Sequence, residues 1–144
     1  MPRVRWTSGS GIVELPDGRT VRCRGLRTPL PADAEPAEVG YYLLGRQPHR
    51  QGWETRWIRW RDFRVPADPT AALRSLREAH ERAASERVEL ACGGGVGRTG
   101  TALAVLAVLS GVPAERAVAW VREHHHPRAV ETPWQRRWVR SLDL

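Results

Sequence analysis

The part of the sequence that most constrains the fold is a short apolar segment, a glycine-rich turn and a longer apolar segment in immediate succession. Val88–Ala91 is rich in apolar residues and bounded by polar ones, which predicts a short buried strand. Thr101–Leu109 has the length and composition of a buried helix, and Gly111 marks its end. Cys92–Gly100 lies between them and contains five glycines. The sequence therefore predicts a strand, a tight turn and a helix, with the turn at the carboxyl end of the strand.

The glycine-rich turn is suited to bind a phosphoryl group. Glycine has no Cβ atom, so the backbone can curl and direct its N–H groups toward an anion, and the following helix adds its positive N-terminal end. A cysteine in this position is expected to ionise and act as a nucleophile, and an arginine can hold two phosphoryl oxygens with its planar fork. We therefore predict Cys92 as the thiolate nucleophile, Arg98 as the phosphoryl clamp and Thr99 as a hydroxyl donor to the sulfur. The predicted phosphate-binding residues are Gly93, Gly94, Gly95, Val96, Gly97 and Arg98.

Two other interpretations fit parts of this turn. It can be a structural turn with an ordinary buried cysteine, because free cysteines are among the most buried residues and glycines commonly serve turns. It also shares features with the Walker loop, Gly-x4-Gly-Lys-Ser/Thr, whose second half is matched by Gly97-Arg98-Thr99. In that alignment Cys92 takes the place of the first glycine and an arginine replaces the lysine, which argues against a nucleotide-binding loop.

Two further motifs lie outside the turn. Trp60-Arg-Asp-Phe-Arg-Val-Pro66 follows the strand-like stretch Thr55–Trp60 and ends at a proline. This order places one carboxylate, that of Asp62, at the tip of a loop beside aromatic rings; a solvated turn residue is the alternative interpretation. The other motif, Ala129–Gln135, reads Ala-Val-Glu-Thr-Pro-Trp-Gln.

Together these motifs resemble those of the cysteine-dependent protein tyrosine phosphatase superfamily. The signature of that superfamily is His-Cys-x5-Arg-Ser/Thr-Gly, its mobile acid loop reads Trp-Pro-Asp-x-Gly-Val-Pro, and a glutamine loop follows near the end of the domain. The matching residues are Cys92, Gly97, Arg98, Thr99 and Gly100 in the first motif, Trp60, Asp62, Val65 and Pro66 in the second, and Gln135 in the third. The departures are Ala91 in place of the histidine, Arg61 and Arg64 in place of the proline and glycine of the acid loop, and Glu131 in place of a glutamine.

The resemblance implies a compact, dual-specificity-like phosphatase that needs neither a metal nor a cofactor. Cys92 would attack phosphorus while Asp62 protonates the leaving oxygen, and water would then hydrolyse the cysteinyl phosphate with Asp62 as the base and Gln135 positioning the water. The implied substrate is a phosphotyrosine protein, with phosphoserine and phosphothreonine as further candidates. An RNA 5′-phosphatase or a phosphoinositide phosphatase of the same chemistry is an alternative. A catalytically weak phosphate-binding module is another.

The remaining sequence predicts an α/β fold in one domain over residues 1–144. A hairpin is expected over 11–24, strands over 39–44 and 55–60, and helices over 68–84, 113–125 and 133–142. Strands that alternate with helices imply a central, mostly parallel sheet flanked by helices on both faces, with the N-terminal hairpin at one edge. Ligands bind beyond the carboxyl ends of such strands, where Cys92 is expected.

Composition narrows the class of protein. Of the 144 residues, 41% are hydrophobic and 27% charged, which is the balance of a globular domain. Thr101–Leu109 is half the length of a membrane span, so no span is expected and the protein is placed in the cytoplasm. Only Cys23 and Cys92 are present, too few for a secreted disulfide scaffold.

The basic residues favour anionic partners. All 23 are arginine and the net charge is +7, which suits phosphoproteins, phosphoinositides or RNA, although genome composition is the simpler explanation and nucleic acid is not the favoured partner. His124, His125 and His126 invite a metal interpretation. Consecutive helical residues point in different directions, so polar residues at a helix end are the better explanation and no metal site is predicted.

Overall fold

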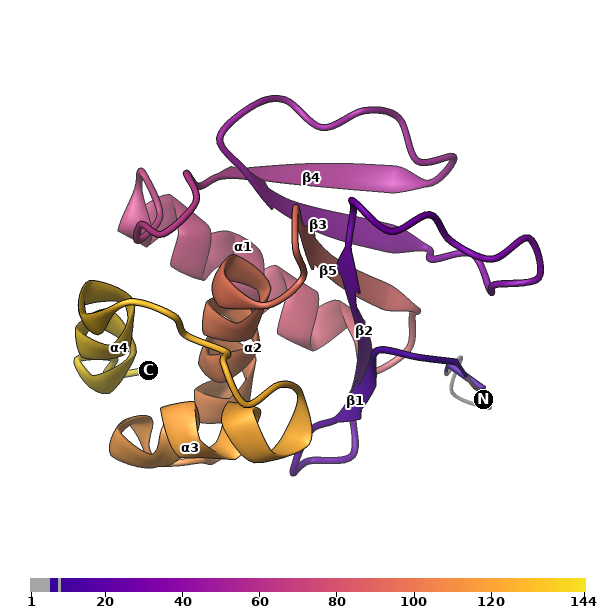
Figure 1. Cartoon of the computed structure of the whole chain (residues 1–144). Coiled ribbons are helices and arrows are strands. Elements are labelled where there is room, and N and C mark those ends of the chain that lie inside the picture. Colours follow the sequence, from indigo (N-terminus) through magenta and orange to yellow (C-terminus); the bar gives the residue numbers. More distant parts are fainter. Residues whose placement is uncertain (1–5, 8) are drawn as a thin grey trace.

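A five-stranded sheet forms the centre of the protein. The computed structural model describes residues 6, 7 and 9–144. The strands are β1 (Ile12–Glu14), β2 (Thr20–Gly25), β3 (Val39–Leu44), β4 (Glu54–Arg59) and β5 (Val88–Cys92), in the spatial order β1-β2-β5-β3-β4. Only β1 runs antiparallel to its neighbour, so the predicted N-terminal hairpin and mostly parallel sheet are confirmed (Figure 1).

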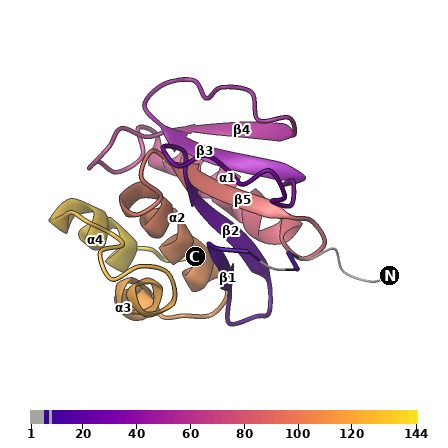
Figure 2. The same cartoon turned by 45° about the vertical axis from the view of Figure 1, so that its right-hand side comes forward.

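One face of the sheet carries the hydrophobic core. Strand residues alternate between the two faces, and in the parallel register Cys23 and Tyr41 lie on either side of Leu90. These side chains pack with buried residues of the helices, among them Leu76 and Leu103. The helices are α1 (Pro69–Arg82), α2 (Gly97–Leu109), α3 (Ala114–His124) and α4 (Pro133–Arg140). Within the described residues, all four lie on this side of the sheet (Figure 2).

The other face is covered by loops, which corrects the expectation of helices on both faces. Segments 26–38 and 45–53, which join β2 to β3 and β3 to β4, contain no helix, and Trp6 adds to the cover by donating its indole N–H to the Val88 carbonyl at 3.1 Å. The reason is topological. Right-handed crossovers that step in one direction across a sheet share a face, whereas the return step from β4 to β5, which contains α1, must use the opposite face.

Beneath the loops this face is polar. Glu89 is fully buried and its carboxylate accepts hydrogen bonds from Arg22, Arg24 and the Tyr42 hydroxyl, each at 2.8 Å. Two guanidinium groups and a phenol therefore balance one buried carboxylate. This arrangement explains why Arg22 and Arg24 alternate in sequence with the core residue Cys23.

The helix boundaries follow local signals. Asp68 caps α1 with its side chain on the Ala71 N–H, and Pro69 occupies the first helical position. α2 is buried along almost its whole length and has 13 residues. No helix among the described residues is long and apolar enough to cross a membrane. It begins at Gly97, four residues before the predicted start, so Arg98 and Thr99 lie in its first turn.

Candidate active site

The predicted nucleophile lies at the carboxyl end of the central strand. Cys92 is the last residue of β5, and residues 93–96 turn the chain into α2. Its sulfur accepts hydrogen bonds from the Gly95 backbone N–H at 3.2 Å and from the Thr99 hydroxyl at 3.0 Å. Both donors stabilise a thiolate more than a thiol. The predicted contact between Thr99 and the sulfur is therefore present in the structure.

The glycines of this turn are required for packing as well as for its curled backbone. A Cβ on Gly95, whose φ is 75°, would lie 2.6 Å from the Gly25 nitrogen at the end of β2. A Cβ on Gly97 would collide with the Glu131 carboxylate, and one on Gly100 would lie 2.5 Å from the Ala129 Cβ. Two distant segments therefore press against the turn and fix its path.

Arg98 connects the glycine-rich turn to the acid loop, residues 60–66. It is 5% exposed, and its Nη1 donates to the Trp60 carbonyl at 3.1 Å. Its Nε lies 3.6 Å from the Asp62 carboxylate and is a buried donor with no hydrogen-bond partner in the described part of the chain. An unsatisfied cationic donor at the turn is suited to an anionic ligand such as a phosphoryl oxygen.

Asp62 lies on an ordered turn. Its carboxylate accepts the Phe63 backbone N–H at 3.0 Å, and the side chain is partly exposed, with a relative accessibility of 41%. Phe63 has a positive φ of 62°, which is rare for a bulky residue. The indole of Trp60 is fully buried, donates to the Arg64 carbonyl and packs edge-on against Trp138 at 5.9 Å, so it anchors the loop to α4.

Gln135 has two partners that the sequence did not indicate. Its side-chain oxygen accepts the Thr132 backbone N–H at 3.1 Å, which completes a capping box at the start of α4. Its side-chain nitrogen donates to the Arg64 carbonyl at 2.9 Å. Gln135 thus connects α4 to the acid loop in this structure, and its role in positioning water stays a prediction.

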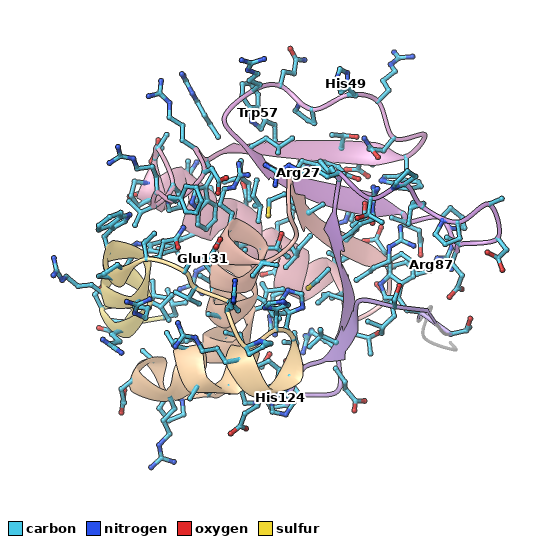
Figure 3. The ribbon with its side chains drawn as sticks, viewed as in Figure 1. Arg27, His49, Trp57, Arg87, His124 and Glu131 are labelled. Carbon is cyan, nitrogen blue, oxygen red and sulfur yellow. The ribbon has the colours of Figure 1, made fainter. Side chains whose placement is uncertain are left out.

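Glu131, which stands where the family motif has a glutamine, lies against the glycine-rich turn. Figure 3 shows it beside the first turn of α2, where its carboxylate is next to Gly97. The preceding residue, Val130, has a positive φ of 62°, a strained conformation for a β-branched side chain. Its carbonyl accepts hydrogen bonds from Arg122 and Arg136, at 3.1 and 3.2 Å, and these bonds hold the strained backbone in place.

Arg27 is a site residue that sequence reasoning missed. Its backbone N–H donates to the Gly93 carbonyl at 3.0 Å, and its Nη2 lies 3.1 Å from the point that a Cβ on Gly93 would occupy. The Nη2 of Arg98 lies 3.4 Å from the same point, so two guanidinium groups converge on the turn. The sequence could have indicated this position, because both β2 and β5 are predicted strands and the carboxyl ends of neighbouring parallel strands lie side by side.

His125 is a second residue with an unexpected partner. It was expected to be only a polar residue at a helix end, but its Nε2 donates to the Gly95 carbonyl at 2.8 Å. Burial lowers the pKa of His125 from its ordinary value of 6.5. His124 bonds instead to the Trp120 carbonyl and His126 to the Arg128 backbone N–H, so the three rings have separate partners. No local pattern links residue 125 to a turn 30 residues away in sequence.

Comparison with known proteins identifies the family. A family model described as protein-tyrosine phosphatase matches residues 37–133. The structure is similar to the crystal structure of Tk-PTP in the active form, with a TM-score of 0.69 and 26% identity over 92% of this chain and 95% of that one. For Tk-PTP in the G95A mutant form the TM-score is 0.65, again with 26% identity, over 74% of this chain and 77% of that one. A search of curated proteins finds no match. The chain therefore belongs to the protein-tyrosine phosphatase family.

Proposed function

We propose that this phosphatase hydrolyses phosphotyrosine in proteins through a cysteinyl-phosphate intermediate, without a metal ion. The observation that supports this most directly is the position of Arg98, whose buried and unsatisfied Nε faces Asp62 while its own turn surrounds the Cys92 sulfur. The residues proposed as nucleophile, anion clamp and acid thus lie near one another at the carboxyl end of β5. That is the set of groups a two-step transfer of a phosphoryl group requires.

In the first step, the Cys92 thiolate forms a bond to phosphorus while the bond from phosphorus to the tyrosine oxygen breaks. Protonated Asp62 gives its proton to that oxygen, and tyrosine leaves neutral. Arg98 and the backbone N–H groups of the turn bind the phosphoryl oxygens as the charge redistributes. In the second step, water attacks phosphorus and the phosphorus–sulfur bond breaks. Asp62 takes the proton of the water, inorganic phosphate leaves, and the thiolate is restored on its two donors.

The burial of the sulfur supports phosphotyrosine over phosphoserine. Cys92 is 2% exposed, whereas Phe63 at the tip of the acid loop is 53% exposed. A phosphate on a long aromatic side chain reaches a buried sulfur more readily than a phosphate on serine. The exposed ring of Phe63 also offers an aromatic surface close to the acid.

The test is metal-free hydrolysis of para-nitrophenyl phosphate and of paired phosphotyrosine and phosphoserine peptides, with EDTA and a reductant. Cys92→Ser should abolish turnover, and Asp62→Asn should lower kcat by 10²–10⁴-fold where the leaving group needs a proton. The matched control is Cys23→Ser, because Cys23 is the only other cysteine and burial raises the pKa of its thiol. Quenching the reaction within one turnover should trap phosphate on Cys92. Retained hydrolysis in Cys92→Ser would refute the mechanism, and phosphopeptide binding without turnover would favour a phosphate-binding module.

A further inference from the structure

A cavity of about 520 Å³ lies against the acid loop, outside the phosphate-binding turn. The end of β4, the acid loop and the start of α4 line this open cavity, and in Figure 1 the loop after β4 and α4 lie on the same side of the molecule. Three of its residues are exposed arginines, and Trp134 forms part of its wall with 47% of its surface exposed. The lining residues are Arg59, Arg61, Arg64, Val65, Ala67 and Trp134.

The positive charge of this cavity has no counterpart in the described residues. The guanidinium groups of Arg59, Arg61 and Arg64 make no ion pair and no hydrogen bond with any residue that the structure describes. The two nearest carboxylates in sequence have other partners, since Asp62 faces Arg98 and Asp68 caps α1. Three cationic forks are therefore available for an anionic ligand.

Two arginines on the helix-covered side of the sheet near β4 have carboxylate partners, unlike the arginines of the cavity. Arg56 and Arg82 bind a set of three carboxylates at distances of 2.7–3.7 Å, and each has at least two partners. These carboxylates belong to Glu54, Glu78 and Glu86. The arginines that face these carboxylates are thus paired, whereas those of the cavity face no carboxylate among the described residues.

We propose that this arginine cavity binds acidic side chains next to the phosphotyrosine of a peptide substrate. The inference rests on the proposed function and adds a substrate class to it. Arg61 directly precedes Asp62, which must touch the leaving oxygen, and Arg64 follows two residues later. Because an extended peptide advances about 3.3 Å per residue, side chains one to three positions from the phosphotyrosine can reach the cavity. Each carboxylate there can accept a bidentate hydrogen bond from an arginine.

The form of the cavity favours a peptide over a nucleic acid. A single-stranded nucleic acid requires a basic track with several aromatic rings on which successive bases stack. Here the wall has one ring, that of Trp134, and its indole nitrogen is already bonded to the Phe63 carbonyl. A hollow lined by three cations and a single ring suits the carboxylate side chains of a peptide.

The test compares kcat/KM for phosphotyrosine peptides that differ only in having glutamate or glutamine at the three positions on each side. The wild type should prefer the acidic peptide by about tenfold, and added salt should reduce this preference. Arg59→Gln/Arg61→Gln should lower the ratio of the two kcat/KM values to about twofold or less. The matched control, Arg74→Gln/Arg77→Gln on the exposed side of α1, removes the same charge and should keep the wild-type ratio. Circular dichroism checks folding, and peptide Kd values in Cys92→Ser give the same ratio without turnover.

The outcomes separate this inference from the proposed function. Equal kcat/KM values for acidic and neutral peptides in the wild type would overturn the cavity's role and leave the phosphotyrosine activity intact. A ratio that survives in Arg59→Gln/Arg61→Gln would do the same. A wild type that hydrolyses no phosphopeptide would overturn both. Faster hydrolysis of a 5′-phosphorylated oligoribonucleotide than of the acidic peptide would assign the cavity to nucleic acid instead.

Discussion

Replacing Thr99 with valine tests whether the sulfur of Cys92 depends on its hydroxyl donor. Thr99 is fully buried in the first turn of α2, and its Oγ1 donates to the sulfur at 3.0 Å. Valine keeps the β-branched shape and removes only the hydroxyl, so the change acts mainly on this hydrogen bond. The Gly95 N–H, at 3.2 Å, would be the sulfur's remaining donor in the described residues.

The magnitude follows from the charge on the sulfur. A hydrogen bond to a charged group contributes about 1.5–3 kcal/mol, and 1.36 kcal/mol corresponds to a tenfold change in rate. The sulfur is charged before it attacks and again when it leaves, so the lost bond weakens both the attacking and the departing thiolate. We expect Thr99→Val to reduce kcat by about 10–100-fold, with the larger loss in hydrolysis of the intermediate, where the thiolate is the leaving group.

The assay is pre-steady-state hydrolysis of para-nitrophenyl phosphate, in which a burst of nitrophenol reports slow hydrolysis of the intermediate. Iodoacetate alkylation of Cys92 at fixed pH gives an independent measure of the reactive thiolate. Thr101→Val is the matched control, because Thr101 is equally buried in the same helix but donates to the Gly97 carbonyl at 2.7 Å. It should lose stability of about 0.5–1.5 kcal/mol and keep kcat within a few-fold.

Three results would contradict this reasoning. Equal loss of kcat in both threonine variants would mean that the hydroxyls act through the stability of α2. An unchanged alkylation rate in Thr99→Val would mean that the bond to the sulfur does not stabilise the thiolate. A lower kcat without a burst would place the effect in the first step instead of the second.

Three further predictions concern the segments around the turn. Because burial lowers the pKa of His125, titration of this residue does not reduce the protein's free energy of unfolding above pH 6.5, but reduces it as the pH falls below that value. Urea titrations should therefore show a smaller loss of stability at acidic pH for His125→Gln than for the wild type. Gly100→Ala should reduce the free energy of unfolding by about 1–3 kcal/mol, because its Cβ would lie 2.5 Å from that of Ala129, and unchanged urea stability would show that the segment can yield. Arg27→Gln should raise the inhibition constant of inorganic phosphate several-fold at low ionic strength, whereas an unaltered constant would place Arg27 outside the anion's reach.

The predicted site residues that lie close together in the structure are brought there by local sequence and by neighbouring strand ends. Cys92, Thr99 and Arg98 lie on one strand–turn–helix unit, whose pattern determines both the turn and the direction of the side chains. Asp62 reaches the same site because the acid loop follows a parallel strand, β4, of the same sheet. Local pattern and parallel topology were sufficient to predict that these four residues lie near one another, and their catalytic roles stay predictions.

The features that the sequence did not predict depend on paths between distant segments. Whether loops or helices cover the second face depends on what the right-handed connections from β2 and β3 contain, and segments 26–38 and 45–53 contain no helix. His125 reaches the turn only through the packing of α3 against α2. The resemblance predicts a water-positioning role for Gln135, but it does not specify the capping bond to Thr132, which follows from the start of α4.

Ala91, which stands in place of the family's histidine, lies on the face of β5 opposite to that of Cys92. Ala91 pairs with Tyr42 on one side and Arg24 on the other, and it is fully buried on the loop-covered face. Cys92, one residue later, points to the opposite face, where the Gly95 N–H and the Thr99 hydroxyl meet its sulfur. A side chain at position 91 is therefore separated from the sulfur by the strand itself and can act on it only through the backbone. Among the residues that the structure describes, the donors to the sulfur come from the turn and α2, so the alanine removes no direct contact to the sulfur.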